Sequence, residues 1–214
     1  MLIADRLTFT YPDADRPYEF TLEALPGEVT AISGASGSGK STLLDLVAGF
    51  LSPTSGTLKL DGLDLIPLPP ERRPVSILFQ SESLFEHLSA ERNVELGLPT
   101  SLPADARRAS VKAALEQVDV AAVGPQRAET LSGGEKQRVA LARTLVRDRP
   151  VLLLDEPFSA LDDTSRTAIR SLVSRLTRER KWVTLLVTHH HDDIEAMASR
   201  HYRLESGRLA ASAA

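Results

Sequence analysis

Residues 34 to 42 read GASGSGKST, a stretch whose residue types and spacing suit the binding of phosphate groups. It matches the pattern G-x-x-x-x-G-K-[ST], in which glycines allow successive backbone N–H groups to turn toward phosphate oxygens. We expect Lys40 to reach the β- and γ-phosphates of a nucleotide and the Ser41 hydroxyl to bind Mg²⁺. The alternative is a flexible glycine–serine loop with an unrelated lysine. The candidate nucleotide-binding residues are Gly34, Ala35, Ser36, Gly37, Ser38, Gly39, Lys40, Ser41 and Thr42.

Two adjacent acids, Asp155 and Glu156, follow the apolar run Val151–Leu154. At the end of a buried strand, Asp155 would hold Mg²⁺ through its water shell, and Glu156 could polarise the water that attacks a γ-phosphate. Adjacent acids at a strand end are by themselves ordinary solvated loop residues. The phosphate-binding pattern elsewhere in the chain favours the catalytic interpretation.

A second glycine-rich stretch, LSGGEKQR, occupies residues 131 to 138. Ser132 and Glu135 have the spacing of a capping box that opens a helix, but Gly133 and Gly134 each lower helix propensity by roughly 1 kcal/mol relative to alanine. A serine hydroxyl, two glycines and a helix N-terminus also make an anion site. Since one loop already surrounds the nucleotide, we expect this second site to meet the γ-phosphate of another copy in a head-to-tail dimer.

These groups need a scaffold that brings them together. Continuous apolar runs predict parallel strands buried on both faces, at Val29–Ile32, Val151–Leu154 and Val183–Val187. A helix is expected at Ser41–Phe50, after the first of them. Alternating segments predict a small antiparallel β layer, at Leu2–Thr10, Tyr18–Leu22 and Gly56–Leu60. Residues 83–150 are rich in Ala, Leu, Glu and Arg, which predicts an inserted helical subdomain in an α/β fold, with the core formed by residues 1–82 and 151–214.

Composition excludes several classes of function. The 214 residues carry 25 basic and 29 acidic side chains, a net charge of -4, and no basic stripe, so nucleic acid is not an expected partner. The absence of cysteine excludes disulfides, thiol nucleophiles and cysteine-ligated metals. No apolar run reaches the length of a signal peptide or of the ~20 residues that span a membrane. Any role at a membrane is therefore expected to act through a partner.

Together, GASGSGKST, LSGGEKQR, LLLDEPFSALD and the histidine after the last apolar run resemble the nucleotide-binding subunit of ATP-binding cassette (ABC) transporters. The resemblance covers essentially the whole chain. It implies a single ABC ATPase domain over residues 1–214, with a RecA-like P-loop core and with residues 83–150 as the helical signature subdomain. It further implies ATP and Mg²⁺ as cofactors, and a homodimer that hydrolyses ATP.

The resemblance also assigns roles to residues that spacing alone does not mark. Tyr11 is similar to the aromatic residue that stacks on adenine, the alternative being a core tyrosine. Gln80 corresponds to the glutamine that senses Mg²⁺ and the attacking water, and joins the magnesium ligands Ser41 and Asp155. His189 corresponds to the histidine that contacts the γ-phosphate. Asp162 belongs to a loop that contacts the opposite subunit.

Three consecutive histidines, Asp163 and the C-terminal end of the chain each require a separate interpretation. His189, His190 and His191 are consecutive and therefore point in different directions, which disfavours a metal site, and the last two are expected to be exposed. Asp163 stands where the family often has proline, at a helix start that accepts either residue. Because the sequence stops soon after Glu205–Arg208, we expect the C-terminal regulatory domain of the sugar importers to be absent.

Within the family, the importer branch fits best. The runs RPVSILFQ and LFEHLS resemble the ATPases of thiamine/thiamine pyrophosphate importers, and iron(III) and polyamine importers share part of this pattern. This implies permease subunits in the membrane, a periplasmic or surface substrate-binding protein, and a peripheral location on the cytoplasmic face of the inner membrane. Leu84, Phe85 and Leu88 could line the groove for the permease or belong to the core. Two rival classes of function are a cytosolic ABC ATPase of cofactor or protein assembly and a P-loop kinase, although a kinase has no use for LSGGEKQR.

Overall fold

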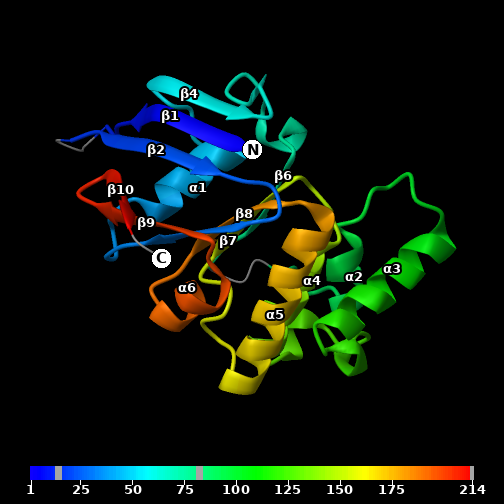
Figure 1. Cartoon of the computed structure of the whole chain (residues 1–214). Coiled ribbons are helices and arrows are strands. Elements are labelled where there is room, and N and C mark those ends of the chain that lie inside the picture. The colour runs from blue at the N-terminus through cyan, green and yellow to red at the C-terminus, as the bar shows by residue number, and fades with distance from the viewer. Residues whose placement is uncertain (13–15, 81–83, 213–214) are drawn as a thin grey trace. The chain divides into compact units, whose positions relative to one another are not determined.

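The computed structural model describes residues 1–12, 16–80 and 84–212 of the chain (Figure 1). These residues form two compact units. The first contains residues 1–77, 149–155 and 173–214, and the second contains residues 78–148 and 156–172. The boundary that the sequence suggested between residues 82 and 83 lies outside the described residues.

A mixed sheet is the main feature of the first unit. Among the described residues its ten strands follow the order β5-β4-β1-β2-β10-β9-β3-β8-β7-β6. The strands are β1 Leu2–Phe9, β2 Tyr18–Ala24, β3 Val29–Ser33, β4 Ser55–Leu60, β5 Leu63–Asp64, β6 Val75–Leu78, β7 Val151–Asp155, β8 Val183–Val187, β9 Arg200–Glu205 and β10 Arg208–Ser212.

The parallel half of the sheet positions the catalytic candidates of this unit. β3, β7 and β8 are the three strands expected from continuous apolar runs, and nearly all of their residues are buried. In register, Val187 of β8 lies opposite Ile32 of β3 on one side and Asp155 of β7 on the other. Because parallel strands end at the same edge of a sheet, this register brings Asp155, the start of the phosphate loop and the start of the histidine segment to one edge.

The antiparallel half was also predicted from the sequence. β1 pairs with β2 on one side and with β4 on the other. Buried and exposed positions alternate along β2, as expected where one face of a sheet packs on the core and the other faces water. The core beneath the sheet includes Phe20, Leu22, Ile32, Leu43, Leu46, Val47, Leu58, Leu153 and Leu185.

Three helices border the strands of the first unit. They are α1 Lys40–Ala48, α6 His191–Met197 and the second half of α5 Asp163–Arg180. α1 differs slightly from the predicted helix over residues 41–50. It begins one residue earlier and ends two residues earlier, because Gly49 adopts a left-handed conformation with φ 90° and closes the helix.

A buried arginine closes the far end of α1. Arg73 is only 3 % exposed, and its guanidinium donates to the backbone carbonyl oxygens of Leu46 and Val47 in the last turn of α1 and of Leu68 in the loop before β6. Burial lowers the pKa of this guanidinium. Its charge faces the negative end of the helix, where a cation is favoured. Arg73 thus fixes the helix that carries the phosphate loop to the chain segment that leads into β6.

Replacing Arg73 by methionine is expected to lower the stability of the protein by about 3 kcal/mol, because several buried carbonyl oxygens lose their donor together. For a chain of this size the melting temperature should fall by about 6–12 °C. The neighbouring exposed Arg72 offers a matched control, since Arg72→Met removes the same charge from the surface. Equal melting temperatures for the two variants would contradict the structural role of Arg73.

The second unit is helical among its described residues, apart from the end of β6 and an isolated bridge. Its α-helices are α2 Ala90–Glu95, α3 Ala104–Gln117, α4 Gly133–Leu145 and the first half of α5. It also contains two short 3-10 helices, η2 Ala121–Val123 and η3 Ala128–Thr130. A third 3-10 helix, η1 Pro70–Arg72, belongs to the first unit.

One buried side chain organises the loop before α2. Asn93 is fully buried, accepts a hydrogen bond from the backbone N–H of Phe85 at 2.8 Å, and donates to the carbonyl oxygens of Phe85 and Ser89. These bonds hold the loop in a shape that leaves the Phe85 ring 50 % exposed. Leu84 and Leu88 are half-buried. Phe85 is therefore a surface residue rather than part of the core.

Candidate nucleotide-binding and hydrolysis site

The predicted phosphate loop follows β3 and leads directly into α1. Gly39 is the residue before the helix and adopts φ 108°. A side chain at this position would also collide with the Tyr18 ring, because an added Cβ would lie 2.4 Å from a ring carbon. The glycine is thus required both by the backbone conformation and by the close approach of an aromatic ring.

Lys40 lies folded over the loop. Its ammonium group donates to the carbonyl oxygen of Gly34 at 2.8 Å and to that of Ala35 at 2.9 Å. These two carbonyls are neutral partners, so the positive charge stays available for an anion at the centre of the loop. This is the location that the sequence motif assigns to the β- and γ-phosphates.

The two expected magnesium ligands of this unit meet. The Ser41 hydroxyl donates to a carboxylate oxygen of Asp155 over 3.2 Å, although 114 positions separate the two residues. Both groups offer oxygen, the ligand atom that Mg²⁺ prefers, and Mg²⁺ commonly takes only one or two protein ligands beside phosphates and water. The pair therefore fits a magnesium ion beside the phosphate loop.

Tyr11 borders the same loop. Its hydroxyl lies 3.2 Å from that of Thr42, and its ring packs edge-on against Phe9 with centroids 4.8 Å apart. Tyr11 is 38 % exposed, which excludes the alternative of a core tyrosine and leaves area for stacking.

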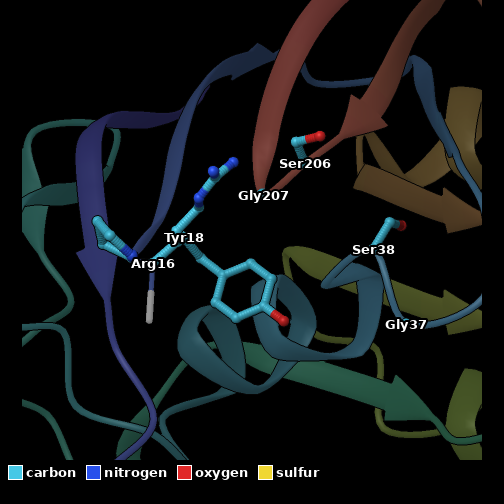
Figure 2. A pocket seen from close by; sticks show the side chains of 7 residues that line it. Arg16, Tyr18, Gly37, Ser38, Ser206 and Gly207 are labelled. Atoms are coloured by element: carbon cyan, nitrogen blue, oxygen red, sulfur yellow. The ribbon is translucent and has the colours of Figure 1, made fainter. Parts of the chain in front are cut away.

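A pocket of about 410 Å³ opens beside the loop, and its residues are shown in Figure 2. One wall comes from the start of β2, one from the phosphate loop and one from the β9–β10 turn. The lining residues are Arg16, Pro17, Tyr18, Gly37, Ser38, Ser206 and Gly207. Sequence reasoning missed all but Gly37 and Ser38, because the three segments meet only when the sheet forms.

His189 follows β8 and is exposed. The preceding Thr188 is buried, and its hydroxyl donates to the Asp193 carboxylate at 2.7 Å and accepts from the backbone N–H of His190 at 3.1 Å. These bonds fix the turn that presents His189. The expectation that His190 is exposed is only partly met, since its ring is half-buried and lies 4.1 Å from that of His189 between centroids. α6 begins at His191, which is exposed.

In the second unit, the start of α4 has the predicted capping box. The Ser132 side chain accepts from the backbone N–H of Glu135, while a carboxylate oxygen of Glu135 accepts from the backbone N–H of Ser132 at 2.8 Å and from its hydroxyl at 2.7 Å. These hydrogen bonds from Ser132 lower the pKa of the Glu135 carboxyl. Ser132 and Gly133 are exposed, so the first turn of the helix is accessible to a ligand.

Glu156 has an unusual backbone. It is 6 % exposed and adopts φ 49°, a left-handed conformation that is rare for residues other than glycine and is often found at functional sites. Its carbonyl oxygen accepts from Ser159 Oγ and from Gln137 Nε2, both at 3.2 Å. The surrounding hydrogen bonds therefore stabilise the strained turn.

Two further candidates of the second unit lie on its surface. Asp162 is exposed and precedes α5, where its Oδ1 accepts from the backbone N–H of Ser165 at 2.9 Å, a bond that lowers the pKa of the carboxyl. Asp163 is the first residue of α5, as expected for a position that also accepts proline. Gln80 is exposed and lies two residues beyond β6, which ends at Leu78.

Gln137 is a residue of this unit that sequence reasoning did not select. It is buried on the apolar face of α4, in line with Leu141 and Thr144. A polar side chain in an otherwise apolar helical stripe was the available signal, because a buried amide needs specific partners.

Comparisons with known proteins identify the family of this chain. The family model described as ABC transporter matches residues 18–159. The chain is 49% identical over 195 residues to the thiamine import ATP-binding protein ThiQ of Salmonella choleraesuis, covering 91% of this chain and 83% of the relative. It is 46% identical to ThiQ of Escherichia coli, over 91% of this chain and 84% of the relative.

Comparison with solved structures identifies the same fold. The dimeric structure of MJ0796, a bacterial ABC transporter cassette, is similar with a TM-score of 0.88 and 28% identity, over 98% of this chain and 96% of that chain. A dimeric post-hydrolysis state of the same cassette, bound to ADP and Pi, has a TM-score of 0.89. The predicted fold class is thereby confirmed. On the strength of the matched family model and of relatives nearly half identical across nine-tenths of its length, the chain belongs to the ABC transporter family of ATP-binding proteins.

Proposed function

We propose that this protein is the ATP-hydrolysing subunit of an ABC importer for thiamine or thiamine pyrophosphate. The observation that carries the proposal is the identity of 46 to 49% to thiamine import ATP-binding proteins over 91% of the chain. The transported molecule does not touch an ATPase subunit, so no side chain of this chain identifies it. The substrate assignment therefore rests on that likeness, whereas ATP binding also rests on the geometry of the first unit.

The first unit binds the nucleotide. The Tyr11 ring stacks on adenine, and the backbone N–H groups of residues 34–42 surround the phosphates with the help of the α1 N-terminus. Lys40 exchanges its two carbonyl partners for phosphate oxygens, a stronger charge-assisted contact. Ser41, Gln80 and, through its water shell, Asp155 would hold Mg²⁺, which when bound would neutralise phosphate charge.

Hydrolysis needs a base and positive charge around the γ-phosphate. Glu156 accepts a proton from the attacking water. Because the residue is almost completely buried, few other water molecules can solvate its carboxylate. His189 contacts the γ-phosphate from the turn fixed by Thr188 and Asp193. Lys40 and His189 thus place hydrogen-bond donors where negative charge spreads in the transition state.

A second copy completes the site. The exposed start of α4, with Ser132, Gly133, Gly134 and Glu135, faces the γ-phosphate bound by the other subunit, and Asp162 contacts that subunit. ATP therefore joins the two subunits, and its hydrolysis releases them. Residues 83–150 serve as the signature subdomain within a single ATPase domain.

Transport requires membrane partners. No helix in residues 1–12, 16–80 and 84–212 is long and apolar enough to cross a membrane. The protein binds permease subunits at the cytoplasmic face of the inner membrane, where the exposed Phe85, held by Asn93, offers an apolar contact. A periplasmic or surface substrate-binding protein delivers the substrate to that permease.

The test is uptake of labelled thiamine in the source cell, with Glu156→Gln introduced at the native locus. We expect thiamine uptake to fall to background while iron(III) and polyamine uptake continue unchanged. Loss of iron or polyamine uptake instead would assign the protein to one of those importers. Unchanged uptake of all three, together with copurification of soluble partners, would contradict the importer proposal and favour a cytosolic ABC ATPase.

A further inference from the structure

Gln137 connects two functional segments of the second unit. Its side-chain amide donates to the carbonyl oxygen of Glu156 at 3.2 Å and to the Ser159 hydroxyl at 3.3 Å. Its side-chain carbonyl oxygen accepts from the backbone N–H of Ala160 at 3.0 Å. With an exposed fraction of 5 %, the side chain is shielded from water, so these bonds are not exchanged for bonds to solvent.

Gly134 brings the same segments into close contact. A Cβ atom added at this position would lie 3.3 Å from the carbonyl oxygen of Ala160. The first turn of α4 therefore packs directly on the backbone at Ala160, and a larger residue at position 134 would increase this distance. This contact gives Gly134 a function within one subunit, in addition to its expected contact with ATP across the dimer.

We propose that Gln137 is a positioning residue that couples the two ATP sites of the dimer. The proposal rests on the proposed function, in which Ser132 contacts the partner's ATP and Glu156 acts on the ATP of its own subunit. Gln137 lies on the same helix as Ser132, five positions away, and holds the backbone of Glu156. A signature helix engaged by the partner's nucleotide thereby fixes the orientation of the general base.

The backbone conformation of Glu156 makes this coupling sensitive to the loss of the hydrogen bonds from Gln137. Its left-handed backbone, at φ 49°, is maintained by surrounding bonds rather than by its own preference. Loss of the amide donors from Gln137 would allow the turn to relax, and the carboxylate would lose its alignment with the attacking water. Alignment within a fraction of an ångström decides much of the rate of such a step.

Gln137→Glu tests the proposal with a side chain of nearly the same shape. The carboxylate keeps an acceptor for the Ala160 N–H but has no donor for Glu156, and it repels the carbonyl oxygen there. We expect kcat for ATP hydrolysis to fall at least about tenfold, with the affinity for ATP nearly unchanged. The melting temperature should also fall, because a buried carboxylate replaces the amide donor to the Glu156 carbonyl oxygen. Gln117→Glu, an identical change at an exposed position in α3, is the matched control and should keep full activity.

A second readout does not depend on activity. Hydrogen exchange of the Ala160 amide should accelerate about tenfold or more in Gln137→Ala, and it should remain slow in the Gln117→Glu control. Unchanged exchange, or a Gln137→Glu enzyme with normal kcat, would overturn the proposal. A fall in kcat matched by an equal loss of ATP affinity would also overturn it, because the role would then be general folding. If the wild-type protein does not hydrolyse ATP, the proposed function fails, and the exchange measurement still decides whether Gln137 fixes this segment.

Discussion

The purified Glu156→Gln protein is expected to bind ATP normally and to hydrolyse it about a thousandfold more slowly than the wild type, within the range for removal of a general base. The amide has the shape of the carboxylate, so the buried site keeps its packing, but it cannot accept the proton of the attacking water. With hydrolysis blocked, ATP should remain between two subunits and a dimer should accumulate. Single-turnover kinetics and gel filtration with and without ATP measure the two effects.

Glu179→Gln provides the control for that experiment. Glu179 is exposed on α5 and pairs with Arg175 at the surface, so the same chemical change there should leave both rate and oligomeric state as in the wild type. Hydrolysis by Glu156→Gln at a rate near that of the wild type would show that another group accepts the proton. A monomeric Glu156→Gln protein in saturating ATP would contradict the proposed release mechanism.

Ser132→Arg is expected to stop hydrolysis while the protein's own phosphate loop still binds ATP with normal affinity. The arginine would occupy the exposed first turn of α4 and obstruct the nucleotide of the partner, so the dimer should not close. Steady-state hydrolysis should fall at least about a hundredfold, an estimate for loss of groups that stabilise transition-state charge. ATP binding, followed by fluorescence of a labelled nucleotide, should be unchanged.

The control must separate loss of the helix cap from loss of the interface. Ser89 caps α2 in the same unit, where its side chain accepts from the backbone N–H of Arg92. Ser89→Arg therefore also removes one cap, which costs about 1 kcal/mol, but does not alter the signature turn. Normal hydrolysis by Ser132→Arg would contradict the hypothesis of a site shared between two subunits.

Much of the fold was predictable because its signals are local. The buried strands were visible as continuous apolar runs, and the capping box of α4 was visible from the spacing of Ser132 and Glu135. The end of α1 was placed two residues too late, at Phe50, although Gly49 was a visible helix terminator. Errors of this kind concern element boundaries, which depend on the balance between weak local preferences.

The remaining part of the site depends on contacts between distant segments. The hydrogen-bond partners of Gln137 lie in a turn about twenty residues further along the chain, and those of Arg73 include carbonyl oxygens at the end of α1. Gln137 lies within LSGGEKQR and Arg73 begins the run RPVSILFQ, but neither motif indicates that its side chain is buried against backbone atoms. Their partners are backbone atoms, which every residue type has, and a sequence pattern cannot identify such partners.

The capping box at the start of α4 has a consequence for how tightly the dimer holds ATP. The Ser132 hydroxyl donates to the Glu135 carboxylate, an anionic acceptor. Contact with a γ-phosphate would exchange one charged acceptor for another, rather than satisfy a vacant donor, and the Glu135 charge would oppose the approach of the phosphate. The net gain from this contact is therefore small. A weak contact of this kind would suit the proposed release of the two subunits after hydrolysis.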